Sequence, residues 1–197
     1  AADPYQPAGQ TAPSPLLPAS AGRRRFLLGV APWAWLVFGC ASMSFAVLAD
    51  LLGGDAWGMP TAYAGVMVGV TLGSGVLIQP VIRRLAETAP ASRPPIVGLA
   101  AASLGMAAGA ILAAASGLPG RALWLLPVAV LLCIGYGTLL VAGLVEVELQ
   151  AGPRDHAGLV AVFYVIAYLG MATPYVLAEL SRSGGPVPWI AVIAVVC

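Results

Sequence analysis

The feature that most constrains the fold of this chain is a series of long apolar runs separated by short polar breaks. About 20 apolar residues in a helix cross a membrane hydrocarbon core of about 30 Å. Five runs of that length lie at residues 26–49, 61–82, 96–116, 122–145 and 157–180, and a sixth, partial run covers 189–197. The pattern predicts an all-α, polytopic membrane helical bundle.

The composition agrees with a membrane protein. Of the 197 residues, 60% are hydrophobic and 9% are charged, whereas about a quarter of the residues in a soluble domain are charged. The mean hydropathy is +0.93. The net charge of +1 gives no indication of a nucleic-acid partner. We therefore expect the lipid bilayer to be the main partner of the chain.

The two ends of the sequence differ from its apolar body. Residues 1–22 are rich in Pro and Ala and have no hydrophobic period, which predicts a disordered cytoplasmic linker. Residues 23–197 form the predicted transmembrane domain. The chain begins without Met, and its last apolar run is too short to span a bilayer. We therefore expect it to be part of a longer polypeptide.

The distribution of arginines predicts the orientation of the spans. Short cytoplasmic loops retain positive charge. One side of the membrane receives seven of the nine basic residues, all of them arginines: Arg23, Arg24, Arg25, Arg83, Arg84, Arg93 and Arg154. Only Arg121 and Arg182 fall on the other side. We expect the residues before the first span to be cytoplasmic. The Arg, Ala and Gly bias is typical of GC-rich bacterial genomes, which suggests a bacterial cytoplasmic (inner) membrane.

Enzymatic and processing motifs are weak in this sequence. "RRRFLLG" and "VFGC" partly match an export signal and a lipidation box, but further full spans follow them. "GSG" at 73–75 could belong to an intramembrane protease, yet the only histidine, His156, falls in a predicted loop. Cys40, Cys133 and Cys197 are far apart and lack metal-site spacing. We expect no enzyme activity, no cofactor and no metal.

Small residues recur at four-residue steps in two spans. Such faces let helix backbones approach closely in lipid. They are Gly65, Gly69 and Gly73 in the second span, and Ala101, Gly105, Gly109 and Ala113 in the third. Both sets predict close packing, either static or between helices that slide. Pro32, Pro127 and Pro174 fall inside spans and predict breaks or kinks.

Tyrosines mark the candidate site. Tyr164, Tyr168, Met171 and Tyr175 lie within roughly 40° of one another at about 100° per residue. Tyr136 and Ser42 add polar groups at mid-depth in other spans. A tyrosine stripe can also serve packing or an interfacial belt. Our hypothesis is that Tyr136, Tyr164, Tyr168 and Ser42 face a cavity and contact a small-molecule substrate.

Several features together resemble the C-terminal half of a major facilitator superfamily transporter. They are the six spans, the Pro-rich linker ending in arginines, "GSGVLIQPVIRRL", and "GYGTLLVAGLVEVELQAGPRDHAGLVAVFYVIAYLGMATPYVL". The resemblance covers residues 23–197, with 1–22 matching the central loop. It implies the six-helix half of that fold, spans seven to twelve with the last helix truncated, facing a missing N-terminal half of the same polypeptide. The first, second, fourth and fifth spans would border the cavity, and the third and sixth would face lipid.

The function implied by the resemblance is secondary active transport. The chain would move a small molecule by alternating access, with proton-coupled efflux by an antiporter as one form. No carboxylate lies at mid-depth in a complete span, so a coupling carboxylate is expected in the missing half. The alternative is a non-transporting structural or lipid-anchored membrane subunit. An upstream reading frame with six more spans would favour transport.

The charged stretch "LVEVELQAGPRDHAG" at 144–158 has two interpretations. Glu146 and Glu148 are two residues apart, so on a helix they point about 160° away from each other. The stretch can be a solvated cytoplasmic hairpin. It can also hold a gate, in which Glu146 pairs with Arg83, Arg84 or an arginine of the missing half. The family's loop motif is matched only at Gly75, Arg83 and Arg84, since Gln79 and Pro80 replace its acidic partner.

Overall fold

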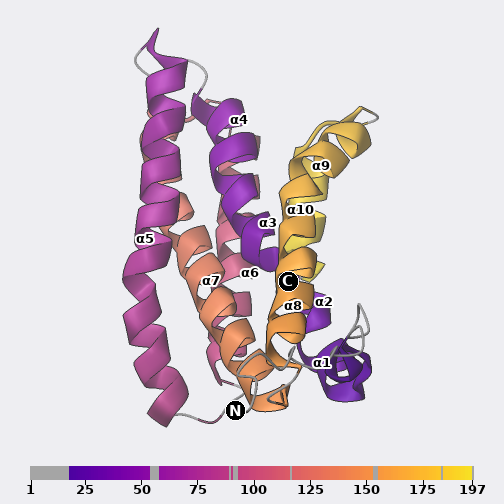
Figure 1. Ribbon diagram of the computed structural model, residues 1–197. Coiled ribbons are helices and arrows are strands. Elements are labelled where there is room, and N and C mark those ends of the chain that lie inside the picture. The colour runs from indigo at the N-terminus through magenta and orange to yellow at the C-terminus, as the bar shows by residue number, and fades with distance from the viewer. Residues whose placement is uncertain are drawn as a thin grey trace, which may run out of the picture.

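The computed structural model describes residues 18–53, 58–88, 90, 93–115, 117–152, 155–182 and 184–196. These residues form helices with short connections, and no β-strand occurs among them (Figure 1). Most of the predicted linker lies outside the described residues, as do Arg154 and Cys197. The end of the linker forms a short 3-10 helix, η1 (Ala19–Gly22).

Five helical segments are long and apolar enough to cross a membrane. They are Ala31–Gly53, α5 (Pro60–Thr88), α6 (Arg93–Ala114), α7 (Arg121–Gln150) and His156–Ser181. A shorter apolar helix, α10 (Val187–Val196), follows them. The predicted all-α class is confirmed, and the chain has the form of a multi-pass membrane protein.

The first and last of the five segments are irregular. The first follows α1 (Arg24–Gly29) and consists of α2 (Ala31–Ala34), α3 (Leu36–Ser42), a π-helical turn η2 (Met43–Leu48) and α4 (Ala49–Gly53). The last consists of α8 (His156–Leu169), a 3-10 turn η4 (Gly170–Ala172) and α9 (Thr173–Ser181).

Prolines explain part of this irregularity. Pro32 and Pro174 occupy the first two positions of α2 and α9, where a missing N–H group leaves no helix hydrogen bond unmade. Both therefore start new helices, as the sequence predicts. Pro127 instead lies inside the continuous helix α7, and Pro80 lies inside α5.

Helix α7 is the centre of the bundle. It packs against α6 on one side and α5 on the other, and α3 and α8 also contact it (Figure 1). In its most apolar 18-residue window, 72% of the residues are buried. α10 packs mainly on α6, so the third and sixth spans lie together behind α7.

The small-residue face of α6 packs closely, as predicted. A Cβ atom on Gly105 would lie 2.7 Å from the side chain of Leu132 on α7, and one on Gly109 would lie 2.8 Å from Leu48 on η2. Such distances are shorter than real Cβ contacts, so a larger residue at either position would force the leucine side chain or the helix to shift.

The corresponding face of α5 makes no helix contact within the described residues. A Cβ atom on Gly65, Gly69 or Gly73 would meet no described atom within 4 Å. The buried stripe of α5 is instead Tyr63, Met67, Thr71 and Gly75, which repeats at the same four-residue step. The two stripes are offset by two residues and so lie on nearly opposite faces of the helix. Because both stripes repeat every four residues, the sequence alone does not show which of them is buried.

Candidate functional site

Four aromatic rings from three spans form a cluster near the middle of the bundle. The aromatic cluster consists of Phe38 on α3, Tyr136 on α7, and Tyr164 and Tyr168 on α8. The ring centroids of Phe38 and Tyr168 are 4.7 Å apart with planes 17° apart, a stacked pair. Phe38 also lies 5.8 Å from Tyr136, and Tyr164 lies 6.3 Å from Tyr168. These centroid distances are typical of interacting aromatic rings.

Backbone geometry fixes the buried end of the cluster. A Cβ atom on Gly75 of α5 would collide with the ring of Tyr136, and one on Gly137 of α7 would collide with the carbonyl oxygen of Gly75. The two helices therefore cross with their backbones in contact. This crossing places Tyr136, which is 8% exposed, against α5 at the level of Gly75. Tyr136 thus anchors the cluster in the protein interior.

The other end of the cluster is open. Tyr168 is 56% exposed, while Phe38 and Tyr164 are half-buried. Tyr164 and Tyr168 are one helical turn apart on α8, so their rings lie one above the other. The cluster is therefore a graded surface of aromatic faces, from a buried tyrosine to an exposed one.

Three of the four predicted cavity residues are brought together in this cluster. Ser42, the fourth, is 3% exposed, and its hydroxyl group donates to the carbonyl oxygens of Gly39, at 3.0 Å, and Gly170, at 3.3 Å. These bonds tie α3 to the helix break at η4. Ser42 therefore links two spans through its hydrogen bonds and is not part of the aromatic cluster.

A second pair of polar side chains lies at the other side of the first span. Ser44 in the π-helical turn and Thr71 on α5 are fully buried, and their hydroxyl oxygens are 2.9 Å apart. A π-helical turn exposes backbone groups that a regular α-helix would use internally, and such turns are frequent at functional sites. This hydrogen bond joins the irregular first span to the inner face of α5.

The gate candidate Glu146 has a different partner from those predicted. Its Oε2 atom lies 3.3 Å from Nη2 of Arg25, and Nε2 of Gln150 donates to the same oxygen at 2.9 Å. Arg23 donates to the carbonyl oxygen of Gln150 at 3.3 Å. The arginines before the first span thus hold the end of α7, a contact across 121 residues of sequence.

The other gate candidates face elsewhere. Arg83 lies with Glu87 and Glu148 along a cleft of about 320 Å³ between α5 and α7. Arg84 is exposed. Glu146 and Glu148 therefore face different neighbours, Arg25 and α5 respectively, as their two-residue spacing predicts. In the described ranges, the ion pairs closer than 4 Å are Arg25 with Glu146 and Glu179 with Arg182.

Sequence reasoning missed two residues of these contacts. Phe38 is an aromatic residue inside the first span, as Tyr136 is inside the fourth, so the same signal could have found it. Arg25 contributes only to the predicted membrane orientation. No local signal links it to Glu146, because the contact depends on how the first and fourth spans pack.

Comparison with models of protein families, with curated proteins and with solved structures gave no match. Within the part of the chain that the structure describes, no group of three or more His, Cys, Asp and Glu side chains could hold a metal ion. The aromatic cluster and the helices that carry it are therefore the features of the chain that bear most directly on its function.

Proposed function

We propose that this chain forms one wall of a membrane transport pathway and that the aromatic cluster contacts the transported molecule. The observation that carries the proposal is the convergence of Phe38, Tyr136 and Tyr168 from three spans, with the outer ring 56% exposed. A ring buried on all sides could not contact a transported molecule, whereas the outer ring of this cluster has a free face. A pathway requires partly exposed groups inside the bilayer depth, where few polar side chains occur.

The helix irregularities support a transport mechanism. The π-helical turn of the first span and the 3-10 turn at Gly170–Ala172 flank the segments that carry Phe38 and Tyr168. Interrupted helices border the substrate sites of many secondary transporters. In the proposed mechanism the substrate lies between this wall and a second half of the same polypeptide, as in the major facilitator superfamily. The two halves rock to open the cavity on alternate sides.

The contact of Arg25 with Glu146 is the proposed cytoplasmic gate contact. It links the segment before the first span to the end of α7, and the pair is part-exposed, at 64% and 16% for the two side chains. Ion pairs in such surroundings contribute little stability and are readily exchanged. Such a pair is suited to forming in one state of the transporter and separating in the other.

Coupling to protons requires a titrating carboxylate inside the membrane. None of the described acidic residues lies at mid-depth in a span. The acidic residues within the described ranges are Asp50, Glu87, Glu146, Glu148, Asp155 and Glu179, and each lies near a helix end or in a connection. If the transporter is a proton-coupled efflux system, the titrating group belongs to the other half of the polypeptide.

Flux measurements in proteoliposomes test the proposal. Tyr168→Ala and Tyr136→Ala should each lower substrate flux about fivefold, since each removes an aromatic contact of roughly 1 kcal/mol. Tyr175→Ala is the matched control, because Tyr175 lies on the same span and is 80% exposed outside the cluster. Equal flux in all three variants would reject the assignment. Repeating the assay with an imposed pH gradient tests proton coupling separately.

The alternative is a structural membrane subunit. The open face of α5, with Gly65, Gly69 and Gly73, favours it, because such a face suits a partner helix. Stable co-purification of another membrane protein on this face, together with no flux across a broad substrate panel, would support the subunit in place of the transporter.

A further inference from the structure

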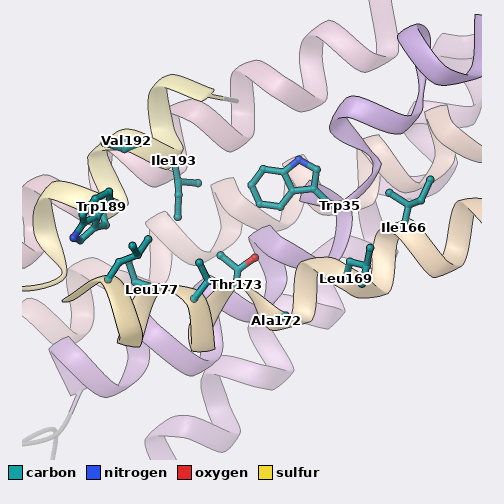
Figure 2. A pocket seen from close by; sticks show the side chains of 11 residues that line it. Trp35, Ile166, Leu169, Ala172, Thr173, Leu177, Trp189, Val192 and Ile193 are labelled. Carbon is teal, nitrogen blue, oxygen red and sulfur yellow. The ribbon is translucent and has the colours of Figure 1, made fainter. Parts of the chain in front are cut away.

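An apolar groove separate from the aromatic cluster lies between the fifth span and α10. Its volume is about 510 Å³. Figure 2 shows Ile166, Leu169 and Thr173 along one wall, Trp189 and Ile193 along the other, and the indole of Trp35 between the two. The groove is large enough to hold a substantial part of a small ligand.

The break in the fifth span accounts for the groove. A Cβ atom on Gly170 would collide with the carbonyl oxygen of Trp35, so the chain must come very close to the first span at this point. From η4 onward, α9 diverges from the bundle, as its tilt in Figure 1 shows. α10 packs mainly on α6. The space left between α9 and α10 forms the groove.

The chemistry of the lining excludes a polar ligand. Its residues are aliphatic or aromatic apart from Thr173, whose hydroxyl group donates to the carbonyl oxygen of Gly170 at 2.6 Å. The indole nitrogen of Trp35 donates to the carbonyl oxygen of Pro32 at 3.0 Å. Because the Thr173 hydroxyl and the Trp35 indole N–H already have partners, the groove offers an occupant mainly contacts with carbon atoms.

The groove is continuous with the surface that faces the bilayer. Val176, Leu180 and Val192 line it and remain 57%, 40% and 50% exposed. From Leu169 to Leu180 the wall rises by eleven residue steps, or about 16 Å at 1.5 Å per residue. One leaflet of the hydrocarbon core is about 15 Å deep. The groove thus has the length, direction and polarity of one extended acyl chain.

We propose that this groove holds one acyl chain of a membrane phospholipid. The lipid belongs to the leaflet on the side of the loop that joins α9 to α10. Its chain lies along α9 and its end reaches Trp35. A bound acyl chain would fill the space beside the helix break and leave no room there for water. This site does not depend on the transport proposal, because it lies on a different face and would exist in a subunit without transport activity.

Photolabelling in vesicles tests the proposal. The full chain is reconstituted with a phospholipid that carries a diazirine near the end of one acyl chain, and the adducts are located by mass spectrometry of peptides. The unaltered protein should carry an adduct on Trp35, which is half-buried at the inner end of the groove.

Two substitutions on one helix provide the control. Val192→Trp fills the groove and should lower the Trp35 adduct about tenfold, the change expected when roughly 1.4 kcal/mol of binding is lost. Val195→Trp, three residues away and 87% exposed outside the groove, should leave it unchanged. Val176→Phe on the opposite wall gives a second block should Val192→Trp fail to fold. Absence of the Trp35 adduct, or equal labelling in the two valine variants, would overturn the proposal. Cross-linking of the groove to another protein would also overturn it.

Discussion

Helices α5 and α7 have almost the same length, 29 and 30 residues, but opposite environments. In their most apolar windows, 22% of the α5 residues and 72% of the α7 residues are buried. Both contain many glycines. On α7 these glycines meet other helices, whereas three of those on α5 face open space. Apolar composition therefore identifies a span, and contact between backbones identifies the central one.

The same comparison separates two kinds of exposed surface. Apart from Arg93 at the start of α6, the exposed side chains of α6 and α10 are apolar and suited to lipid, such as Leu104 and Val195. The exposed part of the aromatic cluster carries the phenol ring of Tyr168 beside Phe38. We interpret the first surface as lipid-facing and the second as pathway-facing. The predictions below test this division, starting with the largest expected effect.

Replacing a glycine at the α5–α7 crossing should have the largest effect. In Gly137→Ala the new methyl group collides with the carbonyl oxygen of Gly75, a backbone atom that cannot turn away. Overpacking of this kind costs about 3 kcal/mol, which lowers the Tm by roughly 6 to 12 °C. Thermal unfolding in detergent measures the loss. Gly69→Ala on the open face of α5 should change the Tm by little, and equal losses would contradict the assigned crossing.

Phe38 contacts both Tyr136 and Tyr168, so removing its ring should lower flux as well as stability. Phe38→Ala and Phe45→Ala each truncate a half-buried phenylalanine of the first span, so each should cost about half the 3 to 5 kcal/mol of a fully buried ring, roughly 2 kcal/mol. Only Phe38 stacks on Tyr168, so only Phe38→Ala should also lower flux by about tenfold. Equal flux in the two variants would place the transported molecule elsewhere.

Breaking the contact at the end of α7 should have the smallest effect on stability. Arg25→Gln and Glu146→Gln should each cost less than about 1 kcal/mol, because the pair is part-exposed. Both should shift the transport rate by the same factor, and the double variant should match either single one. Glu148→Gln serves as the control. If Arg83→Gln reproduces the effect of Glu146→Gln and Arg25→Gln does not, Glu146 pairs with Arg83 during transport, as the sequence predicts, and not with Arg25.

The existence of the spans could be predicted from sequence, and their ends only in part. Hydropathy locates five spans, because a run of about 20 apolar residues has few alternatives to crossing a bilayer. It ends the second at Ile82, whereas α5 continues to Thr88. Arg83 and Arg84 end the apolar run but not the helix, since arginine is a good helix former and its charged end can reach water.

The candidate site could be predicted in part for similar reasons. The tyrosine stripe of the fifth span follows from helical periodicity, which identifies Tyr164 and Tyr168. Phe38 and Arg25 depend on which spans lie side by side, and periodicity within one span carries no such information. Ser42 bonds to backbone carbonyl groups in place of facing a cavity, a local choice common for serine in helices.

Cysteine accessibility at position 168 tests the division between the two surfaces most directly. With Cys40, Cys133 and Cys197 replaced by alanine, Tyr168→Cys is compared with Leu104→Cys on α6, because the native side chains have similar exposure, 56% against 61%. A charged thiol reagent reacts in water and not in hydrocarbon, because thiolate formation requires solvent. If the aromatic cluster lines a transport pathway, the Tyr168→Cys variant is modified in the intact protein and excess substrate slows the reaction, while the Leu104→Cys variant stays unmodified. Two unreactive variants would contradict the account and place Tyr168 against lipid.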